Sequence, residues 1–331
     1  MILVVGGTGL VGSRVTDLLI EQKQHQLRVL ARGGSDWERS SLPGFRRAGV
    51  EVIVGDMNDS KVLEQALDGC KAIINCSGVM RSAQSEDILA VNTRGVENLI
   101  KYGHKHGAQR FIQVSCVGAT EHAINQYFQT KWQAEDLVRN SSLYWTIFRT
   151  SLIFGPGSHL ARVLDYWINR APMVVVVGSG LNKLQPVSAD DVAACVVQSV
   201  YSRETVGQVY DLVGQEALNL KELLTITAQA AGKSTASIRI PSFIGVRLAG
   251  LLANLNPTSP IDAEVMSVFT SELAGDATEM TENFQVKGLP YTATLKQIPA
   301  SQPQSNPARI TTQKAEPLPP QTGQEHDSEP K

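Results

Sequence analysis

The chain has 331 residues, of which 42% are hydrophobic and 19% charged, so it is long enough for one large domain or two unequal ones. Its 30 basic and 32 acidic side chains give a formal net charge of −2 without a long basic run, which argues against a nucleic-acid-binding protein. The four cysteines form no C-x-x-C pair and have no histidine at metal-ligand spacing, so we expect neither a metal site nor disulfides.

The amino terminus and the most apolar stretch of the sequence predict a cytoplasmic protein without a membrane-spanning segment. Met1 leads into the apolar run Ile2–Val5 without a basic leader, so we expect no signal peptide. The most apolar stretch, Phe243–Leu255, is too short to span a bilayer of about 30 Å. For this stretch we favour a lid or core helix of a smaller lobe over an interfacial helix that touches a membrane or a partner.

The first 155 residues alternate short apolar runs with longer amphipathic patterns, which is typical of parallel strands joined by crossover helices. We predict strands at Ile2–Val5, Leu27–Leu30, Glu51–Val54, Ala72–Asn75, Phe111–Ser115 and Trp145–Arg149. We predict helices at Leu10–Glu21, Lys61–Leu67, Asp87–Gly103 and Tyr127–Arg139. Because strands such as Ile2–Val5 are apolar on both faces, residues 1–155 are expected to form a doubly wound α/β domain with a parallel sheet, the Rossmann fold.

The alternation is less regular beyond residue 155. We predict helices and strands at Leu160–Arg170, Met173–Val177, Asp190–Tyr201, Gln208–Val213 and Leu220–Ala231. Residues 156–300 are expected to form a smaller substrate-side lobe that is interleaved with the core. Six of the 15 prolines and no aromatic residue fall in residues 301–331, so we expect this C-terminal tail to be disordered.

A glycine-rich turn follows the first predicted strand. The segment GGTGLVG consists of Gly6, Gly7, Thr8, Gly9, Leu10, Val11 and Gly12. Glycines at this spacing allow a tight strand-to-helix turn, close approach of the backbone to a pyrophosphate, and close packing of the helix on the strand. The helix that starts near Leu10 offers its free N–H groups to the phosphates. The turn therefore predicts a dinucleotide-binding site.

The end of the second predicted strand bears on the choice of nicotinamide cofactor. A carboxylate there would bind the ribose 2′-hydroxyl of NAD, but this position is Ala31 and Arg32 follows at once. A guanidinium favours the 2′-phosphate of NADP. The alternative is that Arg32 is a solvated loop residue and that Asp36 reaches back to the ribose. We favour NADP(H) over NAD(H).

Tyr127 and Lys131 are candidate catalytic residues, because their spacing of four places both side chains on one face of a helix. A nearby ammonium is expected to lower the pKa of a tyrosine hydroxyl. The pair could therefore perform general acid–base catalysis beside a hydride carrier.

These features, taken in order along the chain, resemble the short-chain dehydrogenase/reductase superfamily, in particular its extended and atypical branches with the NAD-dependent epimerase/dehydratases. The resemblance covers about residues 1–295 and rests on GGTGLVG at Gly6–Gly12, GDMND at Gly55–Asp59, VNTRGVENLI at Val91–Ile100, YFQTK at Tyr127–Lys131 and FRTSLIFGPG at Phe148–Gly157. LQPVSADDVA at Leu184–Ala193 is similar to the group related to the nucleotide-binding accessory subunit of respiratory complex I.

The resemblance implies roles for individual residues. Tyr127 matches the catalytic acid/base, and Lys131 matches the residue that contacts the nicotinamide ribose and lowers the tyrosine pKa. The remaining matched positions are Asp56 and Met57 at the adenine pocket, Cys76, Ser77 and Gly78 at the ribose, Asn92 in the fourth-helix motif, and Thr150 and Ile153 beside the nicotinamide. For Asn92, a buried capping or packing role is the alternative.

Two positions depart from the family pattern. The family usually ends its fifth strand with Ser-Ser, and its second serine binds the substrate oxygen, whereas this chain has Ser115-Cys116. Because a thiol is a weaker donor than a hydroxyl, either Ser115 substitutes or the substrate oxygen is poorly polarised. Thr150 stands where the family commonly has proline. Both departures concern turnover and leave cofactor binding untouched.

The leading hypothesis is an NADP-dependent oxidoreductase or epimerase-like enzyme that acts on a carbonyl or alcohol of a small molecule. The alternative is a non-catalytic NADPH-binding accessory or assembly factor of an electron-transfer complex, and redox sensing through cofactor-dependent partner binding is a third. Association with a membrane surface or a protein complex stays open, as does the oligomeric state.

Overall fold

The computed structural model describes residues 1–23, 26–34, 36–80, 85–170, 174–233, 237–255 and 259–295. The tail predicted at residues 301–331 lies outside the described residues.

A seven-stranded parallel sheet forms the centre of the molecule, in the order β11-β6-β5-β4-β1-β2-β3. The strands are β1 (Ile2–Val5), β2 (Leu27–Ala31), β3 (Glu51–Val54), β4 (Ala72–Asn75), β5 (Arg110–Cys116), β6 (Tyr144–Thr150) and β11 (Gln208–Leu212). The strand order reverses between β1 and β4, which is the switch point of a doubly wound fold. The predicted α/β class and its six N-terminal strands are confirmed.

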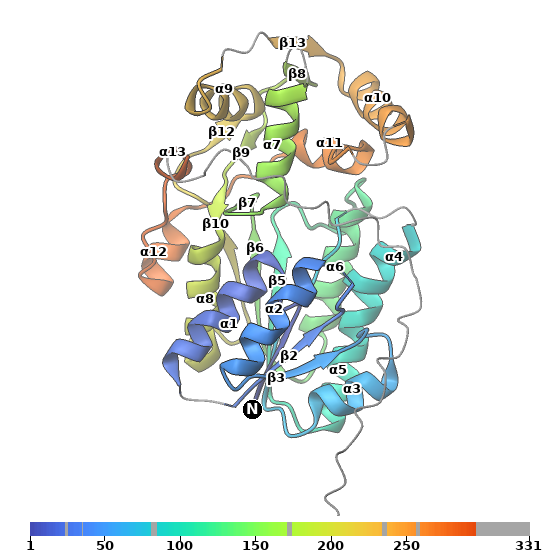
Figure 1. Cartoon of the computed structure of the whole chain (residues 1–331), viewed down its shortest axis with the longest axis vertical. Coiled ribbons are helices and arrows are strands. Elements are labelled where there is room, and N and C mark those ends of the chain that lie inside the picture. Colours follow the sequence, from blue (N-terminus) through green and yellow to red (C-terminus); the bar gives the residue numbers. More distant parts are fainter. Residues whose placement is uncertain are drawn as a thin grey trace, which may run out of the picture.

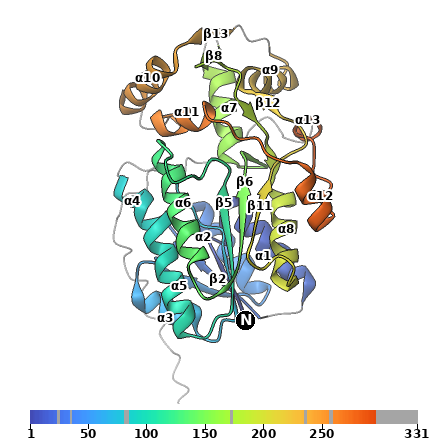
Figure 2. The ribbon, with the colours of Figure 1, turned by 180° about the vertical axis from the view of Figure 1, so that it is seen from behind.

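Helices cover both faces of the sheet (Figures 1 and 2). One face carries α1 (Leu10–Gln22), α2 (Asp36–Arg47), α8 (Ala189–Tyr201) and α12 (Thr278–Phe284), and the other carries α3 (Ser60–Leu67), α5 (Gly95–Lys105) and α6 (Gln126–Arg139). Each face has its own apolar core, with Val4 and Ile112 on the first and Leu3 and Phe111 on the second. This arrangement explains why the strands are apolar on both sides.

The predicted helix Asp87–Gly103 is divided by a wider turn. Its parts are α4 (Ser85–Leu89), the π-helical turn η1 (Ala90–Arg94) and α5. Such π-turns are rare and frequently occur at functional sites. Here the wider turn contains Asn92, one of the predicted site residues.

A smaller lobe lies beyond the carboxyl ends of the strands (Figure 1). Its elements are β7 (Ile153–Phe154), α7 (His159–Arg170), β8 (Val174–Val177), β9 (Lys183–Leu184), β10 (Val187–Ser188), β12 (Leu218–Asn219), α9 (Leu220–Ala230), β13 (Ser237–Ile240), α10 (Ser242–Leu255), α11 (Ala263–Phe269) and α13 (Tyr291–Thr294). Its strands form two-stranded pairs, β7 with β10, β8 with β13 and β9 with β12.

Two predicted elements lie differently from expectation. We expected Asp190–Tyr201 and Gln208–Val213 in the smaller lobe, but α8 and β11 belong to the large sheet and its helical layer.

The stretch Phe243–Leu255, expected to form a lid or core helix, forms α10, and several of its large apolar side chains are exposed.

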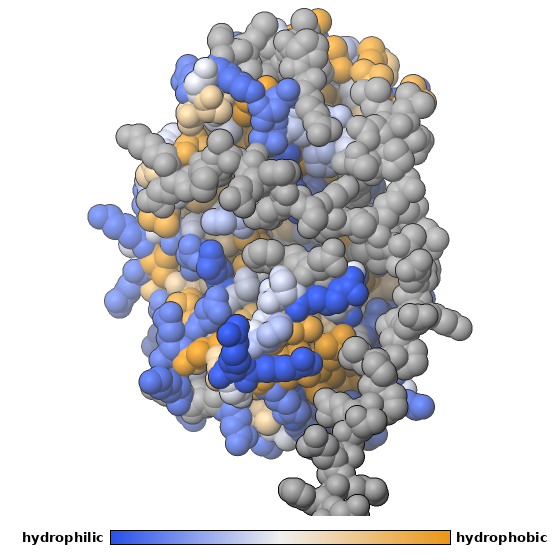
Figure 3. Space-filling view, viewed as in Figure 1, coloured by the Kyte–Doolittle hydropathy of each residue, from blue (hydrophilic) through white to orange (hydrophobic). Residues whose placement is uncertain are grey.

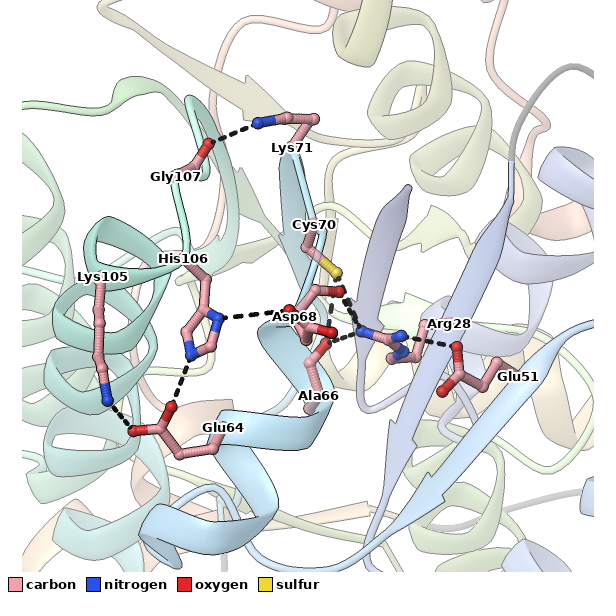
Figure 4. A network of polar contacts seen from close by, with 10 residues as sticks. All are labelled: Arg28, Glu51, Glu64, Ala66, Asp68, Cys70, Lys71, Lys105, His106 and Gly107. Atoms are coloured by element: carbon pink, nitrogen blue, oxygen red, sulfur yellow. Dashed lines mark hydrogen bonds and ion pairs between the residues drawn. The ribbon is translucent and has the colours of Figure 1, made fainter.

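A polar network holds the amino-terminal end of the sheet together, far from the smaller lobe (Figure 4). Arg28 in β2 donates to the Asp68 carbonyl oxygen at 2.7 Å and to the Glu51 carboxylate at 2.7 Å. The His106 ring, at the end of α5, contacts the Glu64 carboxylate of α3 at 2.7 Å. The network fixes α3 between the strands and α5.

Arg110 is a second buried cation that joins several elements, at the start of β5. Its Nη1 donates to the Tyr144 carbonyl oxygen at 2.8 Å. Its Nη2 lies 2.6 Å from Thr146 Oγ1, 2.9 Å from the Ser199 carbonyl oxygen and 2.8 Å from Thr205 Oγ1. Burial lowers the pKa of Arg110 to about 10, and its acceptors come from β6, α8 and the loop after α8.

Replacing Arg110 with methionine should lower the free energy of unfolding by about 3 kcal/mol, because buried acceptors lose a charged donor. Urea unfolding followed by circular dichroism measures the change. Arg203→Met is the matched control, since Arg203 is exposed, and it should stay within about 0.5 kcal/mol of the parent. Equal effects of the two substitutions would contradict the assignment.

Candidate cofactor and catalytic site

The turn after β1 requires glycine at several positions. Gly6 has a φ of +72°. A Cβ at Gly12 would lie 2.1 Å from the Gly6 carbonyl oxygen, and one at Gly7 would lie 2.8 Å from a methyl group of Val29. The start of α1 therefore packs directly against the turn and β2, which is the close helix–strand contact of dinucleotide-binding turns.

The amino terminus of α1 offers room for a ligand at Gly9. This residue is the N-cap and supplies no side-chain hydrogen bond to the helix. A Cβ placed on Gly9 would meet only the Gly6 carbonyl oxygen within 4 Å, at 3.2 Å. Because the first N–H groups of a helix lack intrahelical partners and carry partial positive charge, this turn fits a pyrophosphate.

The loop after β4 lies against the glycine turn. A Cβ at Gly6 would be 3.0 Å from the Ser77 nitrogen. Ser77 is held by Asn75, whose Oδ1 accepts from the Ser77 hydroxyl at 2.5 Å and from its backbone nitrogen at 3.1 Å. The structure therefore brings Cys76, Ser77 and Gly78 beside the turn at the carboxyl edge of the sheet, where such sheets bind ligands.

Lys131 is buried on α6, and its ammonium group reaches the same loop. Its Nζ donates to the Val114 carbonyl oxygen at 3.0 Å and to the Ser77 carbonyl oxygen at 3.3 Å. A Cβ at Gly78 would lie 3.0 Å from this nitrogen, so glycine leaves the space that Lys131 uses. Burial lowers the pKa of Lys131.

Tyr127 lies one helical turn before Lys131 and contacts Cys116 at the end of β5. The Tyr127 hydroxyl and the Cys116 thiol interact with each other. Burial raises the pKa of Tyr127 well above its usual value, and Cys116 raises it further. The expected lowering of this pKa by Lys131 is not seen, because burial and Cys116 both disfavour the charged form of the hydroxyl. Burial also raises the pKa of Cys116 to about 12, so the thiol is neutral.

The structure does not bring the Ser115 hydroxyl to Tyr127. Ser115 Oγ instead donates to Glu135 Oε1 at 2.6 Å, and both side chains are buried. The Ser115 hydroxyl is thus engaged by Glu135, whereas Cys116, at the position of the second family serine, lies beside Tyr127.

Glu135 is a site neighbour that the sequence analysis missed. It stands four residues after Lys131 and is fully buried. Arg149 Nε and Nη2 donate to its carboxylate at 3.0 and 2.7 Å, and Arg139 also contacts it. The spacing of Tyr127, Lys131 and Glu135 along one helix face was the available signal.

Asn92 and Thr150 use their polar groups within the protein. Asn92 Oδ1 accepts from the Val79 nitrogen and its Nδ2 donates to the Val79 carbonyl oxygen, both at 2.9 Å. Its Nδ2 also donates to Thr130 Oγ1 at 3.1 Å. The Thr150 hydroxyl donates to the Ser115 carbonyl oxygen at 3.1 Å. For both residues the observed bonds hold the loops and strands that surround Lys131.

The remaining predicted residues lie around the same edge of the sheet. Met57 is buried with its sulfur 3.9 Å from the Ser77 hydroxyl, whereas Asp56 is exposed. Ile153 pairs with Val187 where the chain enters the smaller lobe. Leu10 and Val11 begin α1, and Thr8 is buried within the turn.

Arg32 is exposed directly after β2, on the side of the switch point where the strand order continues to β3. Across the described residues it forms no ion pair. Asp36, the alternative ribose ligand, begins α2, and its side chain lies outside the description.

Within the described ranges no cluster of three histidine, cysteine or acidic side chains could hold a metal ion. None of the helices in those ranges has the length and apolarity needed to cross a bilayer.

Replacing Gly12 with alanine should weaken NADPH binding at least about tenfold and destabilise the protein by about 2 kcal/mol, because the new methyl group overlaps the Gly6 carbonyl oxygen. Fluorescence titration and thermal unfolding measure the two effects. Gly44→Ala is the control, since nothing lies within 4 Å of its Cβ position in α2. That variant should bind NADPH normally. Normal binding by the Gly12 variant would remove the turn from the site.

A family model described as NAD(P)H-binding matches residues 6–203. Ceramide reductase of Caulobacter vibrioides is 27% identical over 263 residues, which cover 77% of each chain. A nucleoside-diphosphate-sugar epimerase from Staphylococcus aureus shares the fold, with a TM-score of 0.72 at 15% identity over 89% of this chain and 99% of that chain.

Subunit 9 of the NADH dehydrogenase [ubiquinone] 1 alpha subcomplex of Arabidopsis thaliana is 25% identical over 248 residues. These cover 74% of this chain and 61% of that subunit, so the chain accounts for less than two thirds of that relative's length. The matched residues include the glycine turn, Lys131 and the helices from α1 to α8. The chain therefore belongs to the NAD(P)H-binding family.

Proposed function

We propose that this protein is an NADP(H)-dependent oxidoreductase that transfers hydride between the nicotinamide and a carbonyl or alcohol carbon of a small substrate. The observation that carries the proposal is the position of the Lys131 ammonium, 3.3 Å from the Ser77 carbonyl oxygen in the loop that adjoins the glycine turn. Tyr127 lies one helical turn away on the same helix. An acid/base group and a cation thus flank the edge where a dinucleotide binds.

In this proposal the dinucleotide lies across the carboxyl edge of the sheet. The glycine turn holds the pyrophosphate, Asp56 and Met57 border the adenine, and the loop Cys76–Gly78 passes the ribose. Lys131 orients the nicotinamide ribose, and Thr150 and Ile153 border the nicotinamide ring. Residues 1–155 then serve as the dinucleotide-binding core, and residues 156–300 supply the substrate-side lobe.

The protonation states favour carbonyl reduction. NADPH, when bound, supplies the hydride that the carbonyl carbon receives. Because the pKa of Tyr127 is raised well above its usual value, its hydroxyl is protonated at neutral pH and can donate a proton to the carbonyl oxygen. The neutral Cys116 thiol beside it is a second, weaker donor to the same oxygen.

Arg32 supports NADP(H) over NAD(H). Its exposed guanidinium follows β2 directly and lacks an ion-pair partner among the described residues, so a 2′-phosphate would gain a charge-assisted contact there. The residue at the end of β2 is Ala31, so no carboxylate is present there for a ribose 2′-hydroxyl.

A non-catalytic NADPH-binding accessory factor is the second candidate. The observation that favours it is the occupied Tyr127 hydroxyl, which bonds to a thiol where the family usually has a serine. The similarity to the mitochondrial NADH dehydrogenase subunit points the same way.

Tyr127→Phe should lower the rate of NADPH oxidation with a carbonyl substrate at least about 100-fold, because the proton donor is lost, while the NADPH dissociation constant stays unchanged. A panel of aldehydes and ketones with absorbance detection measures the rate. Tyr144→Phe, an exposed tyrosine, is the control and should retain full activity. If the parent binds NADPH and no carbonyl in the panel consumes it, the accessory function is supported instead.

Arg32→Asp should raise the NADPH dissociation constant about 10- to 100-fold and leave that for NADH nearly unchanged, because a carboxylate repels the 2′-phosphate. Calorimetric titration with both cofactors measures the ratio. Arg203→Asp carries the same charge change at an exposed position after α8 and should alter neither value. An unchanged NADPH-to-NADH ratio in the Arg32 variant would exclude this residue as the determinant.

A further inference from the structure

Helix α10 packs onto the smaller lobe through its small residues. Gly245 and Ala249 are buried. A Cβ at Gly245 would lie 2.5 Å from a methyl group of Val177 in β8, and one at Gly250 would lie 3.5 Å from the Ala263 Cβ in α11. The helix therefore approaches β8 and α11 closely at these small residues, and Val246 packs on the same core.

Four large apolar residues of α10 are exposed. Phe243 is 66% exposed, Leu251 59%, Ile244 44% and Leu248 43%. With 3.6 residues per turn these four positions form one continuous face of the helix. Apolar residues also gather at the surface over α10 in Figure 3. A helix that served only the lobe would bury these side chains and expose the small ones.

The sequence segment that contains α10 carries charged residues of one sign. Between Glu222 and Asp262 the chain contains no acidic residue, although 32 of its 331 residues are acidic. The same stretch contains Lys233, Arg239 and Arg247. Both arginines are exposed and form no ion pair within the described part of the chain, and Arg247 lies within the apolar face of α10.

We propose that the exposed face of α10, formed by Phe243, Ile244, Leu248 and Leu251 with Arg247, docks on the surface of an anionic lipid membrane. Exposed apolar side chains enter the acyl boundary, while exposed arginines such as Arg247 favour anionic headgroups. Four side chains of one helix fall short of the roughly 20–30 residues that each side of a stable protein interface contributes. A fluid lipid surface needs no complementary shape, so it fits this face better than a second protein does.

The docking surface is separate from the proposed reaction, because α10 contributes none of the residues around Lys131. In flotation with vesicles, the full chain should bind equal mixtures of phosphatidylglycerol and phosphatidylcholine and bind pure phosphatidylcholine much less. Phe243→Ser combined with Leu251→Ser should weaken binding at least about tenfold. Arg247→Glu should weaken binding only to the anionic vesicles.

Leu289→Ser is the matched control, since Leu289 is 45% exposed on the segment before α13, and it should bind vesicles like the parent. NADPH binding and thermal unfolding of each variant show that the fold is retained. The proposal is overturned if the parent ignores anionic vesicles or if the double variant binds them as well as the parent does. A dimer in sedimentation that the double variant abolishes, without vesicle binding by the parent, would assign the face to a second copy of the chain.

Discussion

The close contact between the first turn of α1 and the Gly6 carbonyl oxygen is the constraint on which the rest of the site depends. Gly12 meets that oxygen with no space for a side chain, and Gly6 in turn approaches the backbone at Ser77. Backbone groups of β1, α1 and β4 therefore meet directly at the switch point, and the helix terminus stays uncovered. A phosphate needs this combination of bare N–H groups and close approach.

The chemistry beside that turn rests on one face of α6, where Tyr127, Lys131 and Glu135 follow at four-residue spacing. Glu135 is buried with Arg149 and Arg139, so its charge is balanced, and removing one partner of such a pair typically costs about 3–5 kcal/mol. Along this face of the helix, Lys131 stands between Tyr127 and Glu135. The ion pair of Glu135 with Arg149 anchors the helix to β6, and the hydrogen bond from Ser115 to Glu135 anchors it to β5. Near the start of the helix, Tyr127 contacts the Cys116 sulfur. In the proposed function, cofactor binding and proton transfer would thus rest on different residues of one helix.

The two ends of the molecule present different surfaces. Around the amino-terminal end of the sheet, Arg28 and Arg110 satisfy backbone and side-chain acceptors, and the polar groups serve stability. In the smaller lobe, α10 buries Gly245 and Ala249 and exposes four large apolar side chains. The carboxyl edge with Lys131 lies between these ends (Figure 1). Stability, cofactor chemistry and the proposed docking face therefore occupy separate regions.

The sequence by itself determined the six N-terminal strands, most of their crossover helices and the glycine turn, because these depend on local periodicity and on backbone space that only glycine leaves. It did not predict α2 (Asp36–Arg47). It also placed Tyr127 and Lys131 on one helix face. Only the tertiary structure decided that Ser115 faces Glu135 while Cys116 faces Tyr127, since the outcome depends on how the end of β5 meets α6. The same holds for the raised pKa of Tyr127, which reflects burial by distant segments. The apolar residues of α10 show no clear periodicity in the sequence. Its packing against Val177 and Ala263 therefore determines which side of the helix faces water.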